Sequence, residues 1–244
     1  MKLSNRTAIS LALALLLGFP LSLPAQWNNK PYTKWSEEEA RKLLNDSPWG
    51  QTQAYTDTSM EFSTGPKATT GISGSNSRQT VDYSDRRIAF RIRFLSAKPI
   101  RQALSRLMEL KQKDKIGSQL AAQLKAFATA EIPDYIIVAL DCDSKEVRTE
   151  LQEARALLDN RKTADLKNRT FLSVRGDRVF LVEYQPPKKD GFGAKFIFPR
   201  MVDGKPFITP ESGEVQFYSE FADNLTFNMR YKVKDMIFQG KLEY

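Results

Sequence analysis

One stretch constrains the fold of this chain more than any other: the uninterrupted apolar run Tyr135–Leu140, which ends at Asp141-Cys142-Asp143-Ser144. Consecutive apolar residues cannot be divided between a core face and a solvent face, so the run predicts a strand buried on both faces. Such a strand needs further layers on both sides of its sheet. A helical pattern with Ser144 as its N-cap comes next and predicts one of the covering helices.

The chain before this run predicts one more strand and two more helices. Alternating residues from 87 to 95 predict a strand with two unlike faces. Its apolar face is formed by Ile88, Phe90, Ile92 and Phe94, and its polar face by Arg87, Arg91 and Arg93. Pro99 suits the start of the first of two helical patterns, and Pro133 ends the second.

From Arg169 onward the apolar period changes from that of a helix to that of a strand. Gly176-Asp177 predicts a tight hairpin turn, and Asp223-Asn224 lies between two clearly alternating strands. We therefore predict an α+β domain over residues 83–244. It consists of two strands and three helices followed by an antiparallel β meander, with the helices packed on one sheet face.

The N-terminus has the three parts of a secretory signal peptide, which we place at residues 1–25. Lys2 and Arg6 are basic, residues 9–19 are apolar, and Leu23-Pro24-Ala25 is a cleavage site. The apolar part is shorter than the ~20 residues of a spanning helix, and no later stretch is a candidate, so we expect no transmembrane helix after cleavage. The expected location is the periplasm or the extracellular medium.

After the signal, residues 26–54 predict a short helix flanked by tryptophans. Ser36 and Glu39 have the spacing of a capping box, and Asn45-Asp46-Ser47-Pro48 ends the helix. A helix of about ten residues is marginal alone in water, so we expect this segment to dock either on the domain or in a partner's groove. Residues 55–82 are rich in Ser, Thr, Gly and Asn and predict a flexible linker.

The N-terminal part of the chain resembles a group of uncharacterised exported bacterial proteins. The resemblance lies in the signal and in the sequence W-S-E-E-E-A-R-K-L-L-N-D-S-P-W at residues 35–49. It covers less than a quarter of the chain. It implies export from a bacterial cell, and because no activity is known for that group, it implies no catalytic residue.

The composition excludes several classes of mechanism. The chain contains no histidine, which excludes Ser-His-Asp and Cys-His pairs, zinc sites of the His type and imidazole acid-base catalysis. Its one cysteine, Cys142, ends a buried strand and is expected to be an inert small hydrophobe. We expect no cofactor and no metal. The formal charge of +8 is a moderate excess that does not by itself predict nucleic-acid binding, so we expect no nucleic-acid partner.

Asp141 and Asp143 are the leading candidates for catalysis. An Asp-x-Asp pair after an apolar strand resembles the first motif of the haloacid dehalogenase phosphatases, in which one aspartate attacks phosphorus and the other is a general acid. This chain has Lys145 where that family has Thr or Val, and it continues into a β meander. The structural alternative is a pair of acids at a strand exit, with Asp143 at a helix start. Paired carboxylates for glycoside hydrolysis are a further option.

Binding is favoured over catalysis. The candidate binding residues are the tryptophans Trp27, Trp35 and Trp49 and the arginines Arg87, Arg91 and Arg93. The arginine row would bind phosphate or an acidic polymer, or else form a solvated strand face or ion pairs. We expect a non-catalytic exported binding or envelope-associated protein, whose partner is an envelope protein or an anionic polymer. The alternatives are a small carboxylate-dependent hydrolase and a structural subunit that pairs through its C-terminal edge strand, and the oligomeric state stays open.

Overall fold

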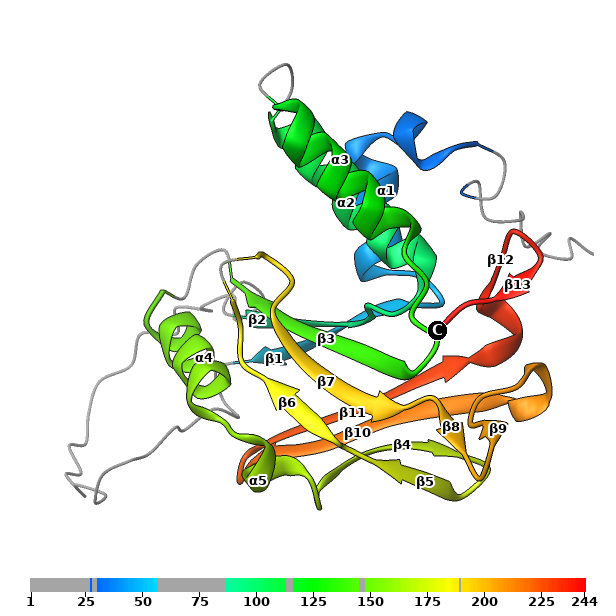
Figure 1. The fold of residues 1–244 in the computed structure, drawn as a ribbon. Coiled ribbons are helices and arrows are strands. Elements are labelled where there is room, and N and C mark those ends of the chain that lie inside the picture. Colours follow the sequence, from blue (N-terminus) through cyan, green and yellow to red (C-terminus); the bar gives the residue numbers. More distant parts are fainter. Residues whose placement is uncertain (1–26, 28–29, 57–86, 113–115, 145–147, 189) are drawn as a thin grey trace, which may run out of the picture.

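The protein was analysed as a computed structural model of the 244-residue chain (Figure 1). The structure describes residues 27, 30–56, 87–112, 116–144, 148–188 and 190–244. The predicted signal peptide lies outside the described residues, as does residue 57 onward of the predicted linker. Residues 55 and 56 belong to a strand.

Two antiparallel sheets form the body of the molecule. The first contains, in order, β1 (Gly50–Thr56), β2 (Arg87–Phe94), β3 (Tyr135–Asp143), β7 (Ala194–Pro199) and β6 (Glu183–Gln185). The second contains β11 (Leu225–Lys232), β10 (Glu214–Ala222), β4 (Thr170–Val174) and β5 (Asp177–Phe180). Two small hairpins pair β8 (Met201–Val202) with β9 (Lys205–Pro206) and β12 (Ile237–Phe238) with β13 (Lys241–Leu242). The described residues also include the short 3-10 helices η2 (Tyr32–Lys34), η6 (Pro210–Ser212) and η7 (Val233–Asp235).

The two sheets pack face to face, with aromatic rings between them. The ring centroids are 5.2 Å apart for Phe90 and Phe227 and 4.9 Å apart for Phe94 and Tyr231, in each case edge to face. Alternation along β2 places its predicted apolar residues on this inner face, where they are at most 3% exposed. The interior between the sheets is therefore the main core, and the other face of β2 is left for the helices.

Three helices lie over the outer face of the five-stranded sheet (Figure 1): α1 (Glu37–Asn45), α2 (Lys98–Gln112) and α3 (Ser118–Thr129). Helix α1 packs against β1, β2 and α2, and α2 packs against α3. The helices α4 (Arg148–Asn160) and α5 (Thr163–Leu166) lie apart from these three, near one end of the two sheets. There the Tyr184 hydroxyl donates a hydrogen bond to the Leu158 carbonyl. The predicted α+β class is confirmed, and the predicted strand Tyr135–Leu140 is the central strand β3.

The segment expected in front of the domain docks on the domain. Ser36 and Glu39 form the predicted capping box. Trp35 and Trp49 are 0% and 2% exposed and contact the ring of Phe238, and the Trp49 Nε1 donates a hydrogen bond to the Glu243 carbonyl at 2.8 Å. The sequence predicts docking of this segment on the domain or in a partner's groove, and the structure shows it docked on the domain. The reason is that strand β1 follows the helix directly and supplies the edge of the first sheet.

Two hairpin turns were predicted, and one needs a correction. The turn at Asp223-Asn224 joins β10 and β11 as expected. In the other hairpin Val174 pairs with Asp177, so Arg175 and Gly176 occupy the turn instead of Gly176 and Asp177. Their φ values of 52° and 97° are what a two-residue turn of this kind requires, and glycine satisfies the second without steric cost.

Candidate functional site

The arginine row of β2 was expected to face solvent or acidic neighbours, and the structure places it under helices. Arg93 is only 5% exposed, and the side chain of Arg91 is 26% exposed. Arg87 begins the strand, but its side chain lies outside the described part. A fully solvated face is therefore wrong for Arg91 and Arg93, because α1 and α2 cover the outer face of the sheet (Figure 1).

A pocket of about 170 Å³ lies between these helices and the sheet. It is lined by Arg41, Leu44 and Asn45 of α1, Leu104, Leu107, Met108 and Lys111 of α2, Arg91 and Arg93 of β2, Asp141 of β3, and Gly191. Four of these side chains are basic and one is acidic. The pocket thus has a cationic floor and rim and an apolar wall of leucine and methionine side chains.

Arg93 connects this pocket to the end of α1. Its Nε donates to the Leu44 carbonyl at 2.9 Å and its Nη2 donates to the Asn45 Oδ1 at 3.0 Å. The last carbonyls of a helix lack partners within the helix and carry partial negative charge, so a cation there is favourable. Burial lowers the pKa of Arg93 to about 10, which still leaves it protonated at neutral pH. Within the described part of the chain, Arg93 has no ion pair with a carboxylate.

Arg91 interacts with both candidate catalytic acids. Its Nη2 lies 2.8 Å from Asp143 Oδ2, and its Nη1 lies 3.8 Å from Asp141 Oδ2. The strand register explains why Arg91 lies near both acids: Arg91 pairs directly with Asp141 across β2 and β3, and Asp143 is two residues further on the same face of β3. The predicted strand exit at Leu140 is wrong: β3 continues through Asp143, since β2 offers pairing partners that far.

The predicted helix start at Ser144 stays a prediction. Helix α4 is described from Arg148 onward, and residues 145–147 lie outside the described part. In the structure Asp143 is the last residue of β3, and its carboxylate accepts a hydrogen bond from Arg91. No helix N-terminus is described beside it. Its contact with a guanidinium accounts for this carboxylate structurally.

Cys142 points to the opposite face of β3 and is 2% exposed. Burial, followed by the charge of Asp141, raises the pKa of its thiol to about 11, while Arg155 opposes this shift. A protonated, enclosed thiol is a poor nucleophile. The geometry agrees with the expectation of an inert core residue.

The raised thiol pKa gives a test at alkaline pH. An unfolded cysteine titrates near ~8.5, so the stability contributed by the neutral thiol is complete below that pH and is lost as the pH rises toward 11. Between pH ~8 and ~10 we expect wild type to lose about 2 kcal/mol more stability than Cys142→Ala, whose cavity cost does not vary with pH. Urea unfolding at several pH values measures the difference, and parallel curves for the two proteins would contradict it.

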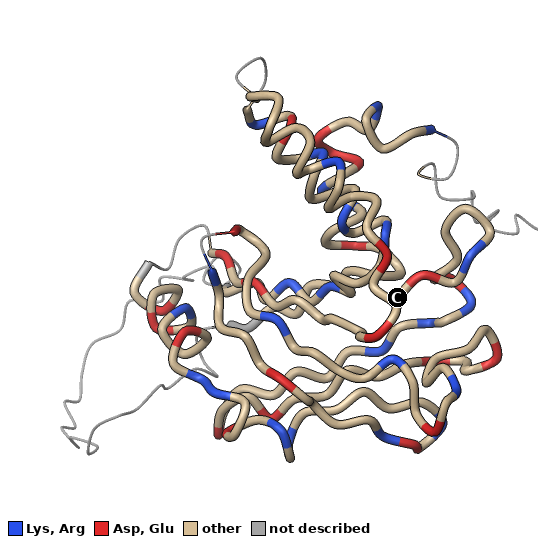
Figure 2. The backbone as a smooth tube through the Cα atoms, viewed as in Figure 1, with Lys and Arg blue, Asp and Glu red and all other residues tan. Residues whose placement is uncertain are grey.

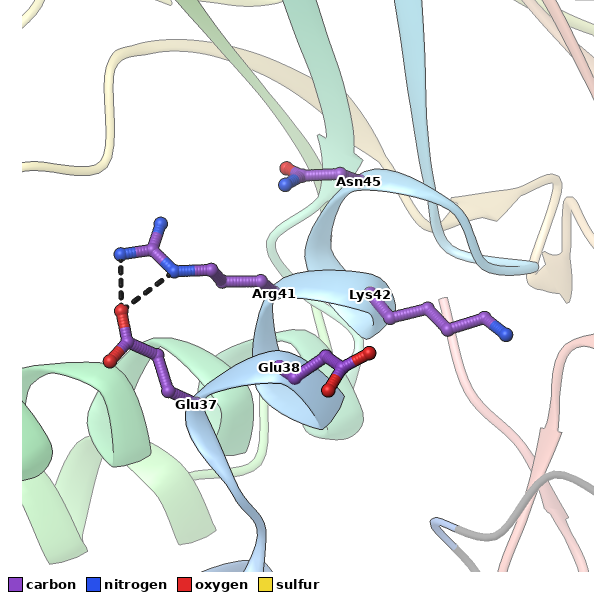
Figure 3. Close-up of a pocket in the computed structure, with 5 residues that line it drawn as sticks. All are labelled: Glu37, Glu38, Arg41, Lys42 and Asn45. Atoms are coloured by element: carbon purple, nitrogen blue, oxygen red, sulfur yellow. Dashed lines mark hydrogen bonds and ion pairs between the residues drawn. The ribbon is translucent and has the colours of Figure 1, made fainter.

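A second hollow, of about 510 Å³, lies along the outside of α1 (Figure 3). It is lined by Glu37, Glu38, Arg41, Lys42 and Asn45, all from one helix. Figure 3 shows Arg41 bound to Glu37 through both Nε and Nη2, with distances to Oε1 of 2.8 Å and 2.6 Å, while Lys42 points the other way. One helix face of exposed side chains does not enclose a ligand. Its relevance is that Arg41 also reaches the pocket over β2.

The tryptophans named as binding residues belong to the core. Trp35 and Trp49 are buried, and Trp27 is partly buried against the same core. An indole that packs inside the molecule is not available to a partner while α1 stays docked. Among the residues that the structure describes, no group of three or more Cys, Asp or Glu side chains has the arrangement of a metal site.

Sequence reasoning missed Arg41, Lys111 and the apolar wall from α2. The available signal was the strand Tyr135–Leu140, predicted to be buried on both faces: a layer over each face of its sheet would also cover Arg93, and a buried charge needs a partner or a function. The sequence did not show that α1 would be one of the covering helices. Without that contact, Arg41 had no connection to the arginine row.

Comparisons with known proteins add little to this geometry. No protein-family model matches the chain, and no curated protein sequence matches it. One solved structure, described as a novel protein of unknown function from Burkholderia pseudomallei K96243, is similar over 59% of this chain and 74% of its own, with 15% sequence identity and a TM-score of 0.39. A likeness at this level supports no argument about function.

Proposed function

We propose that the protein is a non-catalytic binding protein that holds a small anionic ligand in the pocket between α1, α2 and the outer face of β2 and β3. The observation that carries the proposal is Arg93, a buried cation that lines the pocket and has only neutral acceptors as hydrogen-bond partners. A buried charge without an opposite charge is costly, and an anionic ligand would offset that cost. Lys111 adds further positive charge to the lining, and Arg41, which is paired with Glu37, adds further donor groups.

A small ligand fits this site better than a polymer. The helices cover the arginines, so an extended chain has no open row of cations to follow. The pocket of about 170 Å³ is also smaller than the ~300–1,000 Å³ of sites for drug-sized molecules. Figure 2 shows basic and acidic residues interspersed over the part of the chain that the structure describes, which does not resemble the one-sided basic surface of a nucleic-acid reader.

Hydrolysis by Asp141 and Asp143 is the weaker alternative. Arg91 holds Asp143 at 2.8 Å but lies 3.8 Å from Asp141, so one of the two carboxylates is engaged, whereas the paired-acid mechanisms need both. Pairing of subunits through the C-terminal segment was suggested by its aromatic residues. Phe238 and Tyr244 of that segment are buried in the molecule, so they are not available to a second subunit. Binding is the function that a specific observation supports, namely the buried Arg93 in the pocket.

Export belongs to the proposal as well. The basic residues Lys2 and Arg6 and the apolar residues 9–19 support a secreted or periplasmic location. In the described part of the chain, no helix combines the length and apolar character needed to cross a membrane. The proposed protein thus acts in the cell envelope or the medium and binds its ligand there.

The test is a binding measurement with four small probes that each carry an anionic group: inorganic phosphate, succinate, 4-methylpentanoate and L-leucine. Calorimetry at constant ionic strength should detect binding of at least one of them to the full chain. We expect Arg41→Met and Lys111→Met each to weaken that binding about tenfold, because a hydrogen bond to a charged group contributes roughly 1.5 kcal/mol or more.

Lys42→Met is the matched control for Arg41→Met. Lys42 is the next residue on the same helix, is also exposed and points away from Arg41 (Figure 3), and it does not line the pocket over β2. The control should bind as wild type does. The proposal fails if no probe binds, or if the control loses as much affinity as the two pocket variants.

A further inference from the structure

We infer that the ligand of this pocket is a zwitterion of the size of a free amino acid, whose carboxylate meets Arg93, Arg41 and Lys111 and whose ammonium group meets Asp141. This inference rests on the proposed function and names the ligand class for the same site. The feature that requires it is an acidic side chain within a pocket that is otherwise cationic. Asp141 would repel a simple anion, whereas it would attract the positive end of a zwitterion.

Asp141 is available to a ligand. Among the described residues its nearest cationic atom, Arg91 Nη1, lies at 3.8 Å, which is beyond hydrogen-bond distance, whereas Asp143 holds the same guanidinium at 2.8 Å. The side chain of Asp141 is 37% exposed, and it lines the pocket. Arg91 is thus largely neutralised by Asp143, and no donor in the described part of the chain lies within hydrogen-bond distance of the Asp141 carboxylate oxygens.

Arg93 and Asp141 arise from neighbouring positions on one face of the sheet. Arg93 pairs with Ala139 and Arg91 with Asp141, so Arg93 and Asp141 are diagonal neighbours on the same sheet face. Diagonal neighbours on adjacent strands are ~7–8 Å apart at the backbone, and their side chains rise from the same face toward the pocket. The charge of Asp141 also raises the pKa of Arg93 against the effect of burial, which agrees with this proximity.

The rest of the pocket suits an aliphatic side chain. Leu104 and Leu107 are 8% and 9% exposed, and Met108, also on α2, is partly buried. Together with Leu44 they form an apolar wall next to the charged floor. Methionine adapts to differently shaped apolar groups, so the wall accepts more than one aliphatic side chain. The volume of the pocket leaves no room for a peptide.

The experiment compares matched probes that differ in one charged group. L-leucine is measured against 4-methylpentanoate, which lacks the amino group, and against 3-methylbutylamine, which lacks the carboxylate. L-alanine is measured against propanoate in the same way. For at least one of the two amino acids, we expect wild type to bind it at least tenfold more tightly than its deaminated analogue, and we expect 3-methylbutylamine to bind more weakly than L-leucine.

Variants of two aspartates then test the assigned contact. Asp141→Asn should remove the preference for the amino acid by weakening its binding and leaving that of the deaminated analogue unchanged or tighter. Asp203→Asn is the control, with the same change of charge at an exposed position in the turn between β8 and β9, and it should keep the preference because Asp203 does not line the pocket.

The outcomes separate this inference from the proposed function. If the deaminated acids bind as tightly as the amino acids, and Arg41→Met or Lys111→Met still weakens them, the pocket binds anions and the zwitterion is wrong. A preference that survives Asp141→Asn also overturns the inference. If neither the amino acids nor phosphate, succinate or the simple carboxylates bind, both proposals fail.

Discussion

Replacement of Trp49 by alanine is expected to lower the free energy of unfolding by about 3–5 kcal/mol, the range for deletion of a buried tryptophan side chain. The side chain is 2% exposed, its ring packs edge to face on Phe238, and its Nε1 donates to the Glu243 carbonyl. The residue therefore joins the N-terminal segment to the C-terminal end of the described chain. Chemical denaturation followed by circular dichroism measures the loss.

Two further variants separate the parts of this effect. Trp49→Phe keeps an aromatic ring but loses the hydrogen bond, and it should cost about 1–3 kcal/mol because the partly buried Glu243 carbonyl loses its partner. Trp27→Ala is the control, since Trp27 is only partly buried, and it should cost about 1 kcal/mol or less. Equal small losses for Trp49→Ala and Trp27→Ala would show that residues 30–56 are not docked as described.

Arg101→Met is expected to destabilise the protein by at least about 3 kcal/mol. Arg101 is 1% exposed, and its guanidinium donates to the carbonyls of Leu95, Ser96, Phe127 and Ala130. Burial lowers its pKa, but the fixed carbonyl acceptors keep the cation hydrogen-bonded. Methionine fills much of the same volume, so the loss comes from carbonyls left without partners, each at a cost of roughly 1–3 kcal/mol.

The loss of stability in Arg101→Met should come from the several N–H donors of the guanidinium and not from its charge alone. Arg101→Lys keeps the charge but cannot reach four carbonyls at once, so it should recover little of the loss. Arg169→Met removes an exposed arginine that also bonds to a carbonyl, and it should change stability by less than about 0.5 kcal/mol. A full rescue by lysine, or an equal loss in Arg169→Met, would contradict this account of Arg101.

Elements with a strong local pattern were predictable. The hairpin of β10 and β11 combines alternation on both strands with a turn sequence, and its inward residues Phe217 and Phe227 are fully buried, as predicted. The capping box of α1 also has the predicted donors and acceptors. In these elements the signal lies within about ten residues of sequence, so no distant contact is needed to interpret it.

Strand β1 had no such signal. Its sequence Gly-Gln-Thr-Gln-Ala-Tyr-Thr lacks an apolar face, because it is an edge strand whose side chains bond to the other sheet. Gln51 Nε2 donates to the Arg230 carbonyl at 2.8 Å, and Gln53 Nε2 donates to the Thr226 carbonyl at 3.0 Å. These contacts join residues more than 170 positions apart in the sequence, and local periodicity does not encode them.

The sequence by itself determined the α+β class, the buried strand at the centre of the first sheet and the exclusion of histidine chemistry, since each follows from composition or from a short-range pattern. Only the tertiary structure decided that α1 lies over β2, and with it the candidate site. That contact brings Arg41 and Asn45 to Arg93 and Asp141 across segments of the chain that share no local signal. The physical reason is that the burial of apolar side chains determines which elements pack together. Polar groups from distant segments then share a pocket as a result of that packing.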